Sequence, residues 1–342
     1  MGPPNPHDAL FRAAFSRQEN AAAELRAVLP EALVARIDWS TLGLTDGHYV
    51  DEDLASRESD LLYTADLGGP EIAVYVLIEH QSTADRLMPF RMLRYMVRIW
   101  DKWLADREQK GERSKALPPI LPVLLAHAEG GWTAPASMAD LYALPADLLP
   151  AVARYLPSFE LVLDDLAQRT DDDLRARADA GLGLLALLLL RHARDGADLL
   201  ERLGEWGDVW RAVWDAPDGR QAFLMAARYV ALATESGTMQ DLSKKFERML
   251  GQGAREVVMT LGERLIEQGR VEGEAKGRVE GEAKGRVEAQ AEALLRVLAA
   301  RGLPVSDELR ARIDACRDVA TLGRWIDRAV TAQSAAEAIA QV

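Results

Sequence analysis

The sequence predicts an α/β domain, in which a mixed sheet is flanked by helices, followed by an all-α C-terminal half. Short apolar runs bounded by Gly, Pro and Asp occur between residues 59 and 165, as expected for strands. A long amphipathic segment of helical period lies among them. Beyond about residue 171 the strand signals stop and helical patterns continue alone, which marks a change of architecture.

The N-terminal region predicts two helices. Asp8 is a suitable N-cap for the first helix, and Pro30 is expected to end it. Between them apolar residues recur at helical spacing, namely Leu10, Phe11, Ala14, Phe15, Leu25 and Leu29. A second, short helical segment over residues 31–37 is expected to lead into a loop rich in Gly, Asp and Thr.

A β-hairpin is predicted next. Segments 59–65 and 71–79 have the composition of strands, and a cluster of Asp, Gly and Pro between them predicts a turn. Residues 88–109 then predict a helix. Residues 118–126 predict a further strand with its prolines near the start, where a sheet tolerates them. The last predicted strand covers residues 157–163.

An internal repeat follows several helices predicted over residues 172–250. The octapeptide GRVEGEAK occurs from Gly269 and again from Gly277, and it recurs in part from Gly285. Each glycine inside a helix costs about 1 kcal/mol relative to Ala. Pairs such as Glu272 with Lys276 return only about 0.2–0.5 kcal/mol each. The repeat therefore predicts a weakly helical linker or a self-association arm.

These patterns divide the chain into four predicted segments. An α/β domain covers residues 1–170, a helical domain residues 171–250, the repeat arm residues 251–291, and a small helical module residues 292–342. In the last segment Gly302 is expected to end one helix, and Ser306 is expected to cap the next.

Composition limits the classes of function. The 342 residues carry a formal net charge of −13, which argues against a uniformly nucleic-acid-binding surface but permits a local basic face. The single cysteine, Cys316, excludes an internal disulfide framework and a cysteine zinc site, and it favours a cytoplasmic location. The N-terminus lacks the pattern of a signal peptide. The apolar run 181–190 is shorter than a membrane span.

Three polar residues end the second strand of the predicted hairpin. Because side chains alternate along a strand, Glu79 and Gln81 should share one face while His80 points to the other. Asp60 starts the neighbouring antiparallel strand, so the hairpin places it beside Glu79. Two close carboxylates repel unless a cation lies between them, and oxygen ligands on rigid strands suit Mg²⁺.

The predicted helix over residues 88–109 has an apolar and a basic face. The apolar face comprises Leu93, Met96, Val97, Trp100 and Leu104 and is expected to pack on the sheet. The opposite face carries Arg91, Arg94, Tyr95 and Arg98, with Arg86 just before the helix. Arginines arranged in this way are suited to tracking a phosphate backbone near the predicted metal site.

These residues resemble a known nuclease signature. Asp60, Glu79 and Gln81 are similar to the D…(D/E)-x-K pattern of the PD-(D/E)XK superfamily, which has a restriction-endonuclease-like fold. The segments HDALFRAAF, LPEAL, ESDLLY, LIEHQST and MPFRMLRYMVRIW resemble the Rpn family of recombination-promoting nucleases more closely. In that family Gln commonly stands in place of the Lys. The resemblance covers about residues 7–165.

The resemblance implies a Mg²⁺-dependent DNA endonuclease, or one using another divalent cation, linked to recombination or mobile-element biology. Asp60 and Glu79 would ligate the metal, the carbonyl of His80 would be a further ligand, and Gln81 would take the place of the lysine. The DNA would be held by Arg86, Arg91, Arg94 and Arg98. One segment departs from the family: residues 126–132 read AHAEGGW where Tyr-His-Gly usually precedes the Trp.

Two alternatives stay open. The first is a nuclease-like fold that binds DNA or protein without cutting, which the altered 126–132 segment and the net charge favour. The second is a structural protein that oligomerises through the repeat arm and helical tail. Single residues also have alternatives, since Glu24 is either a further acidic ligand or a solvated helix charge, and His80 either a packed side chain or a general base.

Overall fold

The computed structural model describes residues 5–45, 61–68, 73–112, 116–145, 147–177, 181–193, 196–234 and 239–340. The chain divides into two compact units, Met1–Leu261 and Gly262–Val342. The α/β arrangement followed by helices is confirmed. The four predicted segments remain a prediction.

A mixed sheet organises the first unit. Its strands lie in sequence order: β1 (Ile37–Leu44), β2 (Leu61–Leu67), β3 (Ala73–Gln81), β4 (Ile120–Ala126) and β5 (Val162–Asp165). The predicted hairpin is confirmed, because β2 pairs antiparallel with β3. The strands β3, β4 and β5 are parallel, so the carboxyl ends of three neighbouring strands meet at one edge of the sheet.

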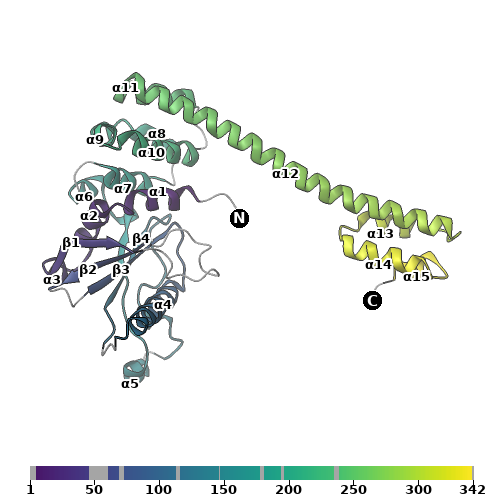
Figure 1. Ribbon diagram of the computed structural model, residues 1–342, viewed down its shortest axis with the longest axis horizontal. Helices are drawn as coiled ribbons and strands as arrows, with labels where there is room; N and C mark the ends of the chain where they lie inside the picture. The colour runs from purple at the N-terminus through teal and green to yellow at the C-terminus, as the bar shows by residue number, and fades with distance from the viewer. Residues whose placement is uncertain are drawn as a thin grey trace. The chain divides into compact units, whose positions relative to one another are not determined.

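Helices cover both faces of the sheet (Figure 1). One face carries α1 (Pro6–Phe15), α2 (Gln18–Val28) and α7 (Leu182–Arg191), and the other carries α4 (Met88–Gln109). The apolar run predicted as a core helix is α7, and its residues from Leu182 to Leu190 are buried. Among the described residues no helix is both long enough and apolar enough to cross a membrane.

The buried face of α4 differs from the prediction. Tyr95 and Ile99 are buried against the sheet together with Met88, Met92 and Met96, whereas Val97 and Leu104 are exposed. Apolar residues occur around most of this helix, so their spacing alone did not determine which side the sheet covers. Tyr95 is therefore a core residue and not part of the basic face.

Two N-terminal expectations are wrong. The helix starts after Asn5, whose side chain accepts a hydrogen bond from the His7 amide, and not at Asp8. The helix is also interrupted at Ser16 and Arg17, so α1 and α2 are two separate helices. Beyond α3 (Glu31–Val34), where the sequence predicts a loop, the chain forms strand β1. The pairing register of β1 with β2 shifts between Asp38 and Gly43. This irregularity removes the alternation by which a strand is recognised.

Further helices complete the first unit, and several of them pack against α1 and α7. They are α6 (Asp171–Arg175), α8 (Gly196–Arg202), α9 (Gly207–Asp215), α10 (Gly219–Ala233), α11 (Met239–Leu250) and the start of α12 (Gln252–Ala300). Trp210, Phe223 and Phe246 meet edge to face in their core. Between β4 and α6 lie α5 (Leu149–Val152) and 3₁₀ turns at Met138–Leu141, Ala153–Tyr155 and Leu166–Gln168.

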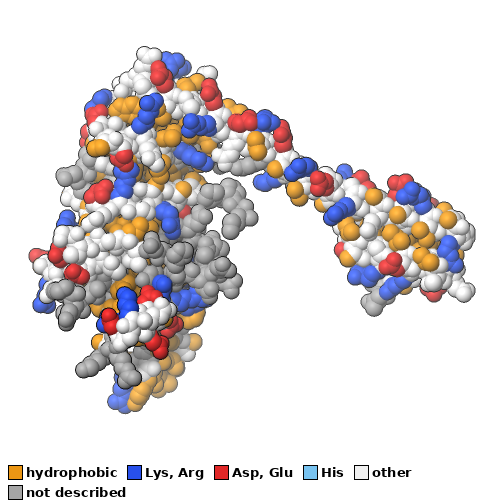
Figure 2. Space-filling view, in the orientation of Figure 1, with side chains coloured by type: hydrophobic (Ala, Val, Ile, Leu, Met, Phe, Trp, Pro, Cys, Tyr) orange, Lys and Arg blue, Asp and Glu red, His pale blue; other side chains and the backbone are white. Residues whose placement is uncertain are grey.

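The second unit contains the rest of α12, α13 (Asp307–Ala315), α14 (Val319–Ala329) and α15 (Ala335–Ala338). Its core is built around Leu294, Leu298, Ile313 and Leu322, and Ser306 caps α13 as predicted. The repeat forms part of one continuous helix of 49 residues, against the expectation of weak helicity. Along it Lys and Arg side chains alternate with Asp and Glu (Figure 2). Arg270, for example, pairs with Glu267 and Glu274.

Candidate functional site at the end of strand β3

Strand β3 carries polar residues out of the core at its carboxyl end. Glu79, His80 and Gln81 pair with Leu124, Leu125 and Ala126 of β4, so they belong to a regular part of the sheet. All three side chains are nonetheless buried. Alternation places Glu79 and Gln81 on the α4 face and His80 on the α1 face, as expected from the sequence.

The side-chain amide of Gln81 forms hydrogen bonds with two oxygen atoms. Its Nε2 donates to Glu79 Oε1 at 2.6 Å and to the backbone carbonyl of His80 at 2.7 Å. Both oxygens therefore lie within hydrogen-bonding distance of one nitrogen position. These are the carboxylate and the carbonyl that the family resemblance implies as metal ligands.

Arg91 of α4 also contacts the carboxylate. Its Nη2 lies 2.8 Å from Glu79 Oε1, and its Nη1 lies 3.2 Å from Asp85 Oδ2 in the turn before the helix. Only 12% of the Arg91 side chain is exposed. The guanidinium thus belongs to the polar cluster at the end of β3, although the sequence placed it on a solvated basic face.

The other sequence-predicted arginines differ in their exposure to solvent. Arg86 and Arg94 are exposed, and Arg98 is half-buried. Asp60 lies outside the described residues. Leu61, which follows it in the sequence, pairs with Ile78, the residue before Glu79.

A stack of imidazole rings lies on the opposite face, behind Glu79. The His80 ring is stacked between Phe11 and His127, with centroids 5.0 and 4.9 Å away, and its Nδ1 lies 3.0 Å from Asp8 Oδ1. The stack continues through His7, whose Nδ1 lies 2.9 Å from the Tyr229 hydroxyl. His80 is thus a packed, hydrogen-bonded residue, one of the two roles left open for it.

Sequence reasoning did not find this histidine cluster. The three histidines that meet, His7, His80 and His127, are far apart in the chain, so their spacing does not indicate a cluster. The segment HDALF offered a signal, because residues one helical turn apart, His7 and Phe11, lie on one side of a helix. Their partners are set by tertiary packing.

Glu24 lies in a separate buried charge cluster on the His80 face. Asp164 of β5 accepts hydrogen bonds from both Arg177 and Arg169, and Arg177 Nη1 approaches Glu24 Oε1 at 3.5 Å. Burial, together with the charge of Asp164, raises the pKa of Glu24 to about 8. Hydrogen bonds from Arg177 hold the pKa of Asp164 below its usual value despite its burial. Glu24 therefore carries the proton of this pair, and it is not a solvated helix charge.

Asp165 holds the turn that departs from the family pattern. Its Oδ2 accepts from the Trp132 amide at 2.8 Å, and its Oδ1 accepts from the Ala167 amide. Gly131 has a φ of +91°, and a Cβ there would lie 2.9 Å from Asp165 Oδ2. Asp165 thus has a structural, capping role, and the turn requires glycine at position 131.

The oxygen donors at the end of β3 fit a hard divalent cation. A carboxylate and a carbonyl converging on one position are ligands that Mg²⁺ accepts, with waters completing its shell. Within the described part of the chain, no three side chains of His, Cys, Asp or Glu gather in a way that could hold a metal ion. Asp60, the second carboxylate of the predicted site, lies outside the described residues.

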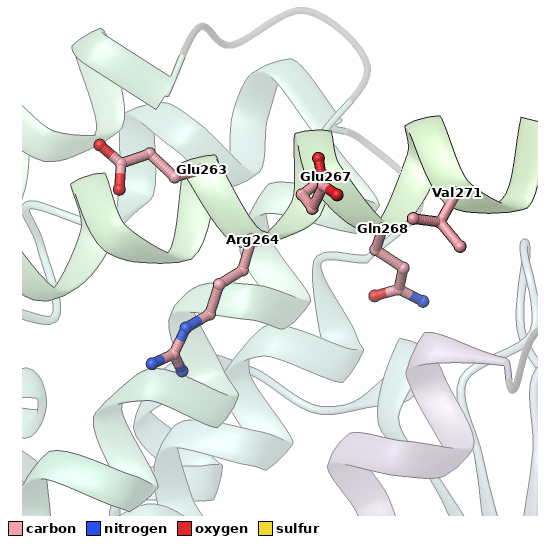
Figure 3. Close-up of a pocket in the computed structure, with 5 residues that line it drawn as sticks. All are labelled: Glu263, Arg264, Glu267, Gln268 and Val271. Atoms are coloured by element: carbon pink, nitrogen blue, oxygen red, sulfur yellow. The ribbon is translucent and has the colours of Figure 1, made fainter.

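A shallow pocket on α12 was a second candidate site. It is lined by Glu263, Arg264, Glu267, Gln268 and Val271, with Arg264 and Gln268 pointing to the same side (Figure 3). All five side chains belong to one helix. No second element supplies a converging group, so this pocket lacks the composition of a catalytic site.

Comparison with known proteins identifies relatives of the chain. The family described as "Putative transposase, YhgA-like" matches residues 5–220. Recombination-promoting nuclease RpnA of Escherichia coli K12 is 33% identical over 200 residues, which cover 58% of this chain and 64% of the relative. RpnC of the same organism is 31% identical over 202 residues, covering 58% and 62%. The chain thus spans less than two thirds of these relatives.

A third relative bears on activity. The "inactive recombination-promoting nuclease-like protein RpnE" of Escherichia coli K12 is 29% identical over 191 residues, which cover 56% of this chain and 60% of the relative. Relatives named as nucleases and a relative named as inactive therefore resemble the chain to a similar degree. No solved structure matches it.

Proposed function

Because the chain belongs to the YhgA-like transposase family, we propose that it is a metal-dependent DNA endonuclease linked to recombination or mobile-element biology. The observation that carries the proposal is the convergence of the Glu79 carboxylate and the His80 carbonyl on one position at the end of β3. The names of the relatives RpnA and RpnC, both recombination-promoting nucleases, support it.

Each residue at the end of β3 has a proposed role. Asp60 and Glu79 bind the divalent cation with the carbonyl of His80, in the manner of the PD-(D/E)XK superfamily. A bound Mg²⁺ supplies Lewis acidity toward the phosphodiester and lowers the pKa of an attacking water. Gln81 orients water or a phosphate oxygen, because its amide carries both a donor NH₂ group and an acceptor oxygen.

DNA is proposed to lie along the exposed start of α4. Arg86 and Arg94 present their charges to solvent there, and Arg98 lies one turn further along the helix. Guanidinium groups contact phosphates through paired N–H donors, which gives affinity without base specificity. A local basic strip of this kind reconciles DNA binding with the net charge of −13.

Two further proposals concern the cellular location and the oligomeric state of the protein. The single cysteine supports a cytoplasmic location. We also propose that a second copy of the chain binds along the repeat arm, residues 251–291, together with the helical tail.

A second candidate function is a nuclease-like module that binds DNA or protein without cutting. The altered residues 126–132 favour it, and so does the similarity to a relative that is named inactive. A DNA complex that forms without divalent cations, weakens with salt and never yields nicked DNA would select this function.

A plasmid-nicking assay tests the proposal. Purified protein is expected to nick supercoiled DNA with Mg²⁺ or Mn²⁺ and to lose this activity in EDTA. Asp60→Ala and Glu79→Ala should each cut at least about 100-fold more slowly, a typical loss for a group that stabilises charge at the reacting centre. Asp66→Ala, a carboxylate near the other end of β2, is the matched control. Wild-type cutting by either site variant would refute the proposed site.

A further inference from the structure

The cluster at the end of β3 contains a cation that is not yet used by the proposed function. Gln81 is uncharged, whereas the Arg91 guanidinium lies 2.8 Å from Glu79 Oε1 and is largely buried. Arg91 also contacts Met88 Sδ at 3.4 Å, so its positive charge sits partly in apolar surroundings. Its attraction to Glu79 is less screened there than on a solvated helix face.

Arg91 occupies an atom that a metal ion would need. Glu79 Oε1 already accepts two hydrogen bonds, one from Gln81 Nε2 and one from Arg91 Nη2. A carboxylate oxygen offers about two lone pairs, so a cation coordinated by this oxygen has to replace one of the donors. Repulsion between a divalent cation and the guanidinium then favours departure of Arg91.

A second carboxylate is available to receive the displaced side chain. Asp85 Oδ2 already lies 3.2 Å from Arg91 Nη1, and Asp85 is partly open to solvent. The buried Nε of Arg91 has no hydrogen-bond partner among the described residues, so one donor is already unused in the pairing with Glu79. The side chain can therefore leave Glu79 while staying at the site.

We propose that Arg91 is the exchangeable cation of Glu79. It neutralises the carboxylate in the metal-free protein. When a divalent cation binds, Arg91 leaves Glu79 and stays paired with Asp85, and in the DNA complex it contacts the scissile phosphate, where it stabilises the developing charge. This inference rests on the proposed endonuclease function and adds a catalytic residue to it. It also assigns to α4 the positive charge that Gln81 cannot supply.

Metal binding and cleavage should respond in opposite directions to the loss of Arg91. In the full-length chain without DNA, Arg91→Ala is expected to bind Mn²⁺ about tenfold more tightly, because a competitor and a repelling charge are removed. Its rate of DNA nicking should fall about 100-fold. Mn²⁺ affinity is measured from the electron paramagnetic resonance signal of free Mn²⁺, which does not depend on activity.

Three further variants complete the experiment. Arg91→Met keeps a long side chain beside Met88 and replaces Arg91→Ala if that variant does not fold, as judged by circular dichroism. Arg91→Lys keeps the charge and should give intermediate values in both measurements. Lys102 lies about three turns beyond Arg91 in α4, and Lys102→Ala should match the wild type in Mn²⁺ affinity and in nicking rate.

The outcomes separate this inference from the proposed function. Unchanged or weaker Mn²⁺ binding by the Ala and Met variants, or nicking at the wild-type rate, would overturn the inference alone. A wild-type protein that binds no Mn²⁺ overturns both. A wild-type protein that binds Mn²⁺ but cuts no DNA refutes the proposed function, and the Mn²⁺ affinities then decide whether Arg91 competes for Glu79.

Discussion

At the scale of single residues, the chain buries a second charge cluster besides the one at the end of β3. Glu24 and Asp164 lie together on the α1 face, and both face the guanidinium of Arg177. Asp164 receives the shorter contacts, at 2.6 and 3.0 Å, so it keeps its charge while Glu24 retains a proton. Such a pair makes the stability of the fold depend on pH.

The raised pKa of Glu24 gives a prediction with a definite sign. Between its ordinary value of 4.5 and about 8 the folded state keeps a proton that the unfolded state releases. Glu24 therefore lowers the free energy of unfolding progressively as pH rises through this window, by up to a few kcal/mol on an order-of-magnitude estimate. Glu24→Gln should weaken this decline, as measured by urea unfolding at pH 5 and pH 8.

Exposed Glu31 provides the control for this experiment. Glu31→Gln should leave the pH dependence of unfolding as it is in the wild type. An equal decline between pH 5 and pH 8 in wild type and Glu24→Gln would show that Glu24 does not hold the proton.

At the scale of elements, the sequence predicted the hairpin, the helix over residues 88–109 and the strand before residue 126, because each has a regular local pattern. It also predicted that Glu79 and Gln81 share a face, which follows from strand alternation alone. It did not predict β1, whose bulge removes that alternation, or the side of α4 that faces the sheet. The contact of Arg91 with Glu79 depends on that side, so local pattern could not reveal it.

The turn over residues 127–132 offers a prediction about a single element. Gly131→Ala should destabilise the protein by more than about 1 kcal/mol, because the new Cβ meets both Asp165 and Gln168 at a positive φ. Gly130→Ala is the matched control, since Gly130 also has a positive φ but open space around it. Thermal unfolding of the two variants measures the difference, and equal melting temperatures would argue against a tight contact with Asp165.

At the scale of the whole molecule, the repeat arm is costly as an isolated helix. Its five repeat glycines, Gly269, Gly273, Gly277, Gly281 and Gly285, face open space, and each costs about 1 kcal/mol relative to Ala. Ion pairs such as Arg270 with Glu274 offset only part of this cost. Ile266, Val271 and Val279 are also exposed, so a second copy of the chain that covers them would supply the missing burial.

Association through the arm is testable by mass in solution. The full-length protein is expected to form dimers or larger species in light scattering, and Val279→Glu should shift it toward monomer by placing a charge in the contact. Leu232→Glu, on an exposed leucine of α10 outside both the arm and the helical tail, should leave the mass unchanged. A monomeric wild type, or an unaltered mass for Val279→Glu, would remove the proposed role of the arm.

The histidine stack joins segments of the chain that are synthesised at different times. The stack brings His7 together with His80 and His127. A hydrogen bond between His7 and Tyr229 adds a residue that lies 222 positions after His7. A ribosome delivers the chain from the N-terminus, so helix α1 emerges before the segments that carry His80, His127 and Tyr229. Nascent chains that end before Tyr229 lack the last of these contacts. If the stack supports His80 and hence Glu79, the polar cluster at the end of β3 is complete only after Tyr229 has been synthesised.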